Sequence, residues 1–243
     1  MQHLRLKYLI TSLFLITGLF NTTYCNNIKI DSLKYLVNKK SDTTQVLINL
    51  QLVSEYKNIN IDSAFHYSEE ALIIIEDIKY EKGLGLYYQS LADLYKKRSL
   101  YVQALRYYDK SLTIFEKINY KNGISQVYTG IGDIHEYQRN DSIALSYYKK
   151  SIEIAEEIGD LFLVASNYNN IGAILKINKP DEAIEYFNKA ISIYEDIGDK
   201  ASIATCYNNL GILYSIHEDY NKSEQYFLSA LEIKRQNNNR HGE

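Results

Sequence analysis

The side chains that could carry out catalysis or bind a metal are few and widely separated in this 243-residue sequence. A zinc hydrolase would need ligands at a fixed helical spacing, as in His-Glu-x-x-His, or several cysteines close together. His66, His135 and His217 belong to no such motif, and Cys25 and Cys206 are the only cysteines. The sequence therefore predicts no metal site, no cofactor and no enzymatic activity. A hydrolase or transferase that depends on His135 or His217 is kept as an alternative.

Glycine pairs and acidic pairs could also suggest a binding site. Gly83-Leu84-Gly85 and Gly130-Ile131-Gly132 are isolated Gly-x-Gly pairs outside the strand-turn-helix context that a phosphate-binding loop requires. The acidic pairs Glu69-Glu70 and Glu156-Glu157 lie in helical patterns typical of a solvated face, where lysines accompany the acidic residues. We interpret the glycines as helix-packing positions or unit starts, and the acidic pairs as solvated surface.

The elements that would position any site follow from a pattern that recurs about every 40 residues. In each copy a first helical pattern opens with a tyrosine, followed three and four residues later by an aliphatic and a small residue. A second helical pattern carries small, aromatic and small residues at i, i+4 and i+7. The four copies span residues 83–122, 123–162, 163–201 and 202–241; their tyrosines are Tyr88, Tyr128, Tyr168 and Tyr207, and their triplets begin at Ala104, Ala144, Ala183 and Ser223. This period predicts stacked two-helix units, none of which can bury its apolar face alone.

Three glycines in the middle of first helices indicate how the two helices of a unit meet. Gly132, Gly172 and Gly211 each occupy a position where glycine costs about 0.5–1 kcal/mol relative to alanine. Close approach of a partner helix would offset that cost. We predict that the aromatic residues of the second helices fill the space between successive hairpins.

The order of aromatic, aliphatic and small residues, followed by Ala-x3-Phe/Tyr-x2-Ala/Ser, resembles the tetratricopeptide repeat. The resemblance implies an all-α, right-handed α-solenoid of stacked antiparallel hairpins over residues 42–243, with a degraded first unit at 42–82. Residues 26–41 are predicted to be a linker or a capping helix, with Leu33, Leu36 and Val37 on one face. The usual repeat has about 34 residues; the longer form here resembles the sensor regions of bacterial signalling proteins.

The first 25 residues form a segment of a different kind. His3, Arg5 and Lys7 precede an apolar run over residues 8–20, and a short polar stretch ends at Cys25. A basic start, an apolar core of about 7–15 residues and small residues at the end are typical of a secretory signal peptide. The apolar run is shorter than the ~20 residues that a membrane span needs. We predict export to the periplasm or the membrane with cleavage after Cys25; a lipid anchor on that cysteine, an uncleaved anchor and an accidental apolar start are the alternatives.

The net charge of the chain indicates which partners it can bind. Removal of residues 1–25 would change the formal net charge from −3 to −5, because Arg5 and Lys7 would be lost. A nucleic-acid partner would need clustered basic residues, so none is predicted.

Gly242 falls where a further unit would begin, and the sequence given stops at Glu243. We predict a fragment of a longer signalling protein, with possible membrane attachment through a missing C-terminal segment; an array that ends here is the alternative.

The family resemblance also implies where a ligand would bind. Four positions on each first helix are expected to line a concave groove that binds a protein or peptide. The candidates are Gln89, Asp93 and Lys96 in the repeat 83–122, Gln126, Thr129, Asp133 and Glu136 in the repeat 123–162, and Asn169, Lys176, Asn208 and Ser215 in the last two repeats. Relatives that clamp the acidic tail of a chaperone place Asn where this chain has Asp93 and Asp133, so a neutral or basic peptide is the better fit.

These observations lead to one functional hypothesis with an alternative. The chain is expected to be a non-enzymatic protein- or peptide-binding scaffold, the extracytoplasmic input region of a bacterial signalling protein. The alternative is an intracellular, peptide-responsive regulator of the tetratricopeptide type, which requires that residues 1–25 do not direct export. Cys206, the only cysteine left after cleavage, is predicted to be a small packing residue in an apolar helix.

Overall fold

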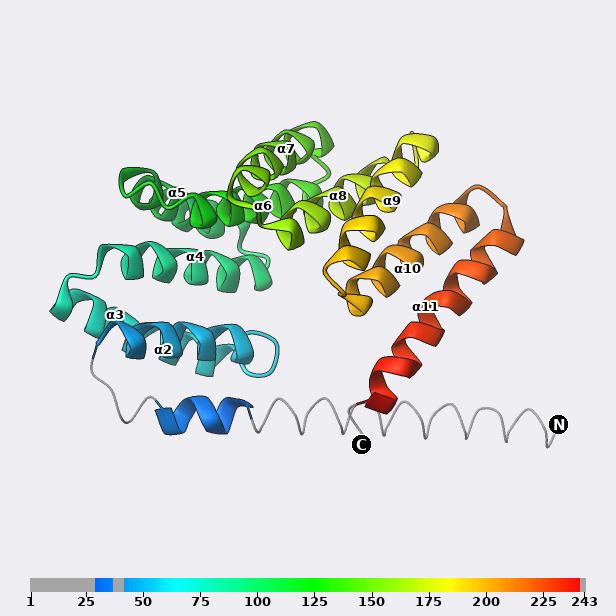
Figure 1. Cartoon of the computed structure of the whole chain (residues 1–243). Helices are drawn as coiled ribbons and strands as arrows, with labels where there is room; N and C mark the ends of the chain where they lie inside the picture. Colours follow the sequence, from blue (N-terminus) through cyan, green and yellow to red (C-terminus); the bar gives the residue numbers. More distant parts are fainter. Residues whose placement is uncertain (1–28, 37–41, 241–243) are drawn as a thin grey trace. The chain divides into compact units, whose positions relative to one another are not determined.

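The structure is a computed structural model that describes residues 29–36 and 42–240, all of whose regular elements are α-helices (Figure 1). The predicted signal peptide lies outside the described residues. The chain divides into two compact units, Met1–Arg98 and Ser99–Glu243. None of the described helices combines the length and the apolar composition that crossing a bilayer requires.

The described part of the first unit contains a short helix and three long ones. The short helix spans residues 29–36, and the long ones are α2 (Thr43–Tyr56), α3 (Ile61–Ile78) and α4 (Glu81–Lys97). Ile30 and Leu33 of the short helix form an apolar cluster with Ile48 and Leu52 of α2. Of the face predicted for this segment, Leu33 is buried and Leu36 is 45% exposed. Val37 lies outside the described residues.

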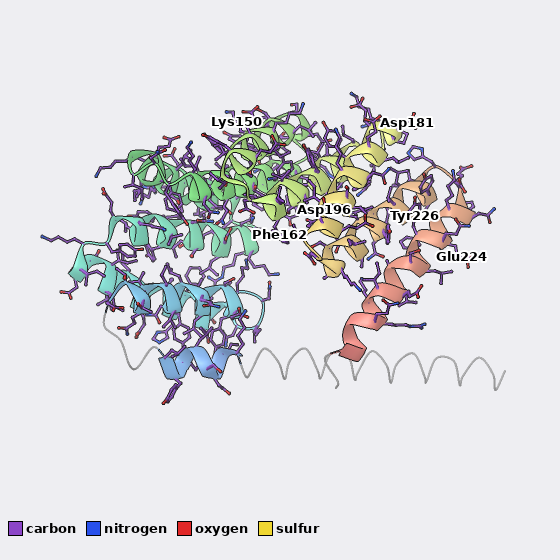
Figure 2. All side chains as sticks on the ribbon, in the orientation of Figure 1. Lys150, Phe162, Asp181, Asp196, Glu224 and Tyr226 are labelled. Carbon is purple, nitrogen blue, oxygen red and sulfur yellow. The ribbon has the colours of Figure 1, made fainter. Side chains whose placement is uncertain are left out.

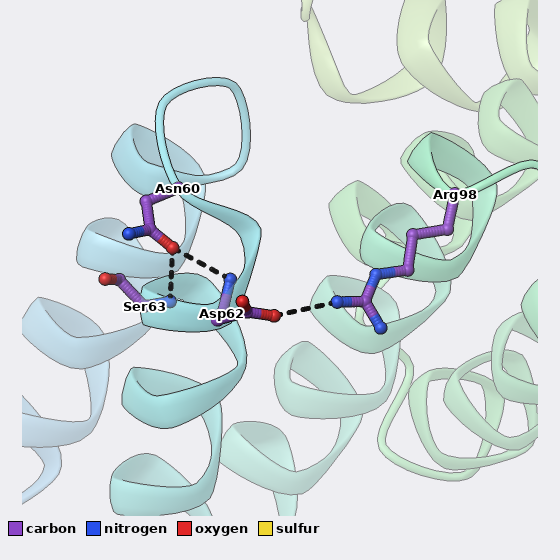
Figure 3. A network of polar contacts seen from close by, with 4 residues as sticks. All are labelled: Asn60, Asp62, Ser63 and Arg98. Atoms are coloured by element: carbon purple, nitrogen blue, oxygen red, sulfur yellow. Dashed lines mark hydrogen bonds and ion pairs between the residues drawn. The ribbon is translucent and has the colours of Figure 1, made fainter.

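Polar contacts at the start of α3 join it to the end of α4 (Figure 3). The side chain of Asn60 caps α3, because its Oδ1 accepts hydrogen bonds from the backbone N–H groups of Asp62 and Ser63, both at 3.1 Å. The Arg98 guanidinium donates to Asp62 at 2.9 Å and lies 4.7 Å from the ring centroid of Phe65. Since the Asp62 side chain is 86% exposed, this ion pair adds little to stability.

The second unit is a run of seven described helices in which each helix packs against the next along the chain (Figure 1). They are α5 (Tyr101–Lys117), α6 (Lys121–Tyr137), α7 (Asp141–Ile158), α8 (Leu161–Leu175), α9 (Pro180–Asp196), α10 (Lys200–Ile216) and α11 (Tyr220–Arg240). Such sequential packing of helix hairpins is the arrangement of an α-solenoid. The predicted fold class is therefore confirmed.

The mid-helix glycines mark the closest helix contacts. A Cβ atom added to Gly172 of α8 would lie 2.8 Å from Phe187 of α9, and one added to Gly132 of α6 would lie 2.7 Å from Tyr148 of α7. These rings pack against the glycine of their own hairpin and also cluster with the first helix of the next one, so the prediction that they fill the space between successive hairpins is confirmed. The backbone left open by a missing Cβ admits the ring edge directly.

The first-helix tyrosines pack on tyrosines of the second helices, as predicted for core positions. The ring centroids of Tyr128 and Tyr147 are 5.9 Å apart, and those of Tyr168 and Tyr186 are 5.8 Å apart. Lys150 of α7, labelled in Figure 2, places its ammonium group 5.2 Å from the Tyr147 centroid. The tyrosines therefore hold the two helices of a hairpin together.

Glycine and aspartate form the turns between successive hairpins. Gly159 and Gly198 have φ angles of +72° and +75°, the left-handed conformation that ends a helix. The side chain of Asp160 then accepts a hydrogen bond from Leu163 N, and Asp199 accepts one from Ser202 N. The sequence Ile-Gly-Asp occurs at both sites and predicts this turn, with glycine for the left-handed helix end and aspartate to cap the next helix.

Candidate functional site

The best-defined part of the predicted site is a pair of carboxylates on α6. Asp133 and Glu136 lie one turn apart, and the hydroxyl oxygen of Tyr148 on α7 is 3.0 Å from Asp133 Oδ1 and 2.7 Å from Glu136 Oε2. The Tyr148 ring is fully buried against Gly132, so its hydroxyl has a fixed position from which to donate to either carboxylate. Packing of α7 on α6 therefore holds the two acids together.

Burial determines the electrostatics of this pair. It raises the pKa of Glu136 above the usual 4.5, and the negative charge of Asp133 raises it further. The Tyr148 hydrogen bond and the positive charge of Lys176, which follows α8, act in the opposite direction. Burial also raises the pKa of Tyr148, which keeps its hydroxyl protonated and able to donate. The site therefore holds a half-buried glutamate whose charged form is disfavoured by burial.

The raised pKa of Glu136 makes a prediction about stability. The folded protein binds this proton more tightly than the unfolded chain does, so the contribution of Glu136 to stability falls as pH rises from about 4 to about 7. Glu136→Gln keeps an acceptor for Tyr148 and removes the charge. We expect its urea midpoint to exceed that of the wild type at pH 7 and to converge with it near pH 4.

The matched control is Glu153→Gln, which changes an exposed glutamate on α7. Its midpoint should follow the wild type at both pH values. A Glu136→Gln protein that is less stable than the wild type at pH 7, or that keeps a constant difference across the range, would contradict the assigned role of burial.

Thr129, also predicted to bind a ligand, is engaged in a buried network. Its Oγ1 lies 2.9 Å from Ser151 Oγ and donates to Asn167 Oδ1 at 3.0 Å, and Asn167 Nδ2 donates to Ser151 Oγ at 2.9 Å. Ser151 and Asn167 are fully buried. The three side chains come from α6, α7 and α8 and join two successive hairpins. We therefore assign Thr129 a structural role.

Asn169 forms a second link between hairpins. Its Oδ1 accepts a hydrogen bond from Asn209 Nδ2 of α10 at 2.9 Å, and Cys206 Sγ lies 3.4 Å away. Burial raises the pKa of Cys206 to about 12, so the thiol stays protonated and behaves as a packing residue. The Asn209 side chain therefore links α10 to α8. The N–H groups of the Asn169 amide are the part of this pair that a ligand could use.

The remaining candidates divide between the two units. In the second unit Gln126 donates to Asn122 Oδ1 at 3.0 Å, Asn208 is half-buried and Ser215 is exposed. In the first unit Gln89, Asp93 and Lys96 lie half-buried on α4, with Lys96 Nζ 3.8 Å from Asp93 Oδ1. Within the second unit the structure therefore brings Asp133 and Glu136 together with Tyr148.

The sequence pattern assigned some residues to packing and did not indicate the hydrogen bonds that their hydroxyl groups form. Tyr148 and Ser151 were recognised as core positions of the second helix, yet their hydroxyl groups organise the acids and the buried network. The tyrosine hydroxyl, at a position where the next two repeats carry Phe187 and Phe227, is the signal that could have revealed this. Within the described residues no three His, Cys, Asp or Glu side chains converge in a way that could hold a metal ion.

The geometry defines a helical-repeat protein of the binding-scaffold type, and sequence comparison identifies the family. The tetratricopeptide repeat model matches residues 84–157 and 163–236, more than half of the chain. The chain therefore belongs to the tetratricopeptide repeat family. No curated protein sequence matches it.

Solved structures share the fold at low sequence identity. BtubC (BKLC) from P. vanneervenii is 21% identical with a TM-score of 0.66, over 88% of this chain and 90% of that one. A Rap protein complexed with Competence and Sporulation Factor is 14% identical with a TM-score of 0.67, over 88% and 72%. A STAND protein with a tetratricopeptide repeat sensor from Pyrococcus horikoshii is 19% identical with a TM-score of 0.61, over 86% and 36%. These similarities establish the fold.

Proposed function

We propose that the protein is a non-enzymatic scaffold that binds a protein or peptide on the first helices of its repeats. In the second unit the proposed binding face comprises Asp133, Glu136, Lys176, Asn208 and Ser215. The observation that carries this proposal is the half-buried acid pair held by Tyr148. A positively charged ligand group would compensate the charge that burial leaves unfavourable, so the face suits a basic or neutral peptide.

The structural neighbours support a role in signalling. One neighbour is a signal transduction ATPase whose tetratricopeptide repeats are named as its sensor, and another is complexed with Competence and Sporulation Factor. We propose that this chain is likewise the input region of a bacterial signalling protein. Residues 1–25 would direct its export. Mass spectrometry of the processed protein should then find Asn26 at its N-terminus; an intact N-terminus on cytosolic protein would favour the intracellular regulator.

Selection from a random peptide library tests the binding proposal. The wild type should enrich peptides that contain Lys or Arg, and Asp133→Asn with Glu136→Gln should lower their affinity by about tenfold, since charge-assisted hydrogen bonds would be lost. The amide side chains of both substitutions keep a hydrogen-bond acceptor for the Tyr148 hydroxyl. Asp133→Lys is avoided because it would place a cation beside that hydroxyl. Glu153→Gln is the control for loss of a surface charge. Equal affinity in the double variant and the wild type would show that the face is misplaced.

A further inference from the structure

The last helix carries an apolar face that differs from the equivalent face of every earlier second helix in this unit. Phe227, Leu228 and Leu231 of α11 are 39%, 57% and 43% exposed. The ring of Phe227 also packs against Gly211 of α10, and beside it the rings of Tyr214 and Tyr226 stack at 5.4 Å. The exposed side is therefore available for a contact that the described chain does not make.

The earlier repeats show what normally covers this face. One stripe of each second helix packs under the first helix of the following hairpin. The stripe of α7 clusters with Val164 and Ile171 of α8, and the stripe of α9 clusters with Ile203 and Leu210 of α10. The earlier stripes are Leu105, Tyr108, Leu112 and Phe115 on α5, Leu145, Tyr148, Ile152 and Ala155 on α7, and Ile184, Phe187, Ile191 and Tyr194 on α9. All twelve of these residues are buried or half-buried.

The equivalent stripe on α11 reads Glu224, Phe227, Leu231 and Lys234. Its centre keeps the large apolar residues, but its two ends carry exposed charges of opposite sign. The earlier stripes are apolar along their whole length, so the charged ends distinguish the α11 stripe from them, and its apolar centre distinguishes it from a solvated helix face. Leu228 widens that centre at a position where the earlier helices carry exposed Asp109, Lys149 and Asn188.

The stripe is complementary to itself when two copies of the helix run antiparallel. If the helices cross level with Ser229, Phe227 of one copy lies opposite Leu231 of the other, since each is two residues from the crossing point. Glu224 then lies opposite Lys234, five residues or about 7.5 Å from the crossing point along each helix axis. A two-fold symmetric contact of this kind forms two Phe–Leu contacts and two Glu–Lys pairs.

We propose that α11 is a homodimer contact, formed by antiparallel packing of the Glu224–Phe227–Leu231–Lys234 stripe on the same stripe of a second copy. One helix from each copy is a small interface, so the dimer should form in the micromolar range. Its affinity should fall with salt, because exposed ion pairs are screened.

Charge reversal with sedimentation velocity on the purified full chain tests this. Glu224→Lys and Lys234→Glu each convert two attractive pairs into two repulsive ones, and each should weaken dimerisation by roughly tenfold or more. An equimolar mixture of the two variants should recover the wild-type affinity, because every pair across the mixed dimer is again of opposite charge. The double variant should recover it as well.

The matched control is Glu232→Lys, which makes the same charge change as Glu224→Lys on an exposed residue of α11 outside the stripe. It should leave the affinity within about twofold of the wild type. The proposal is overturned if the wild type stays monomeric through the micromolar and submillimolar range, if the stripe variants weaken the dimer no more than the control, or if the mixture fails to restore it.

Discussion

Phe187→Ala should lower the free energy of unfolding of the second unit by about 3–5 kcal/mol, the range for removing a fully buried aromatic ring. Phe187 is 0% exposed and packs directly against Gly172 of the facing helix. The cavity would be lined by the backbone of α8 and could not close without moving two hairpins, so the loss should lie at the upper end. Urea unfolding followed by far-UV circular dichroism measures it.

Two other phenylalanines provide a matched series. Phe227 packs against Gly211 in the same way but is 39% exposed, and Phe162 is 51% exposed with its ring centroid 5.9 Å from that of Tyr194. Phe162→Ala should lower the free energy of unfolding by about 1 kcal/mol. The loss for Phe227→Ala should lie between those for the Phe162 and Phe187 variants. Equal losses for the Phe187 and Phe162 variants would mean that close packing at the glycines does not determine the stability of the array.

Asn49→Leu is expected to stabilise the first unit by about 1–2 kcal/mol, an unusual sign for a core substitution. Asn49 of α2 is fully buried, and neither its Nδ2 nor its Oδ1 has a hydrogen-bond partner among the described residues. A buried amide without partners costs about 1–3 kcal/mol. Leucine has a similar volume and no polar atoms to desolvate, so its introduction should raise the urea midpoint.

Asn167→Leu is the matched control with the opposite expected sign. Asn167 is equally buried, but its amide bonds Ser151 and Thr129. Its replacement removes one hydrogen-bond partner each from the buried Ser151 hydroxyl and the half-buried Thr129 hydroxyl, and should destabilise the second unit by about 1–3 kcal/mol. If both asparagine variants lose stability, Asn49 has a partner that is essential to the fold.

The repeat pattern was sufficient to predict the helices and the residues that pack between them. Small and aromatic residues at fixed spacing predicted the close contacts at Gly132 and Gly172, and Ile-Gly-Asp predicted the turns at Gly159 and Gly198. These features depend on one helix face or one turn at a time. Helical periodicity and backbone conformation are local properties, so a sequence records them directly.

The candidate site was predictable only in part. The sequence placed Thr129 and Asp133 on the same helix face and gave them equal roles, but Thr129 bonds into the core whereas Asp133 pairs with Glu136 beside Tyr148. Which hydrogen bond each side chain forms depends on atoms that come within about 3 Å of each other from residues 12 to 38 positions apart in sequence. No periodicity encodes that distance.

The sequence by itself thus determined the repeat unit, the apolar stripes and the positions where helices approach most closely, because these follow from residue size and spacing along a helix. Only the tertiary structure decided which polar atoms form hydrogen bonds inside the core and that the stripe on α11 is left exposed. The physical reason is that hydrogen bonding and burial are properties of pairs of elements. They exist only after the hairpins have packed.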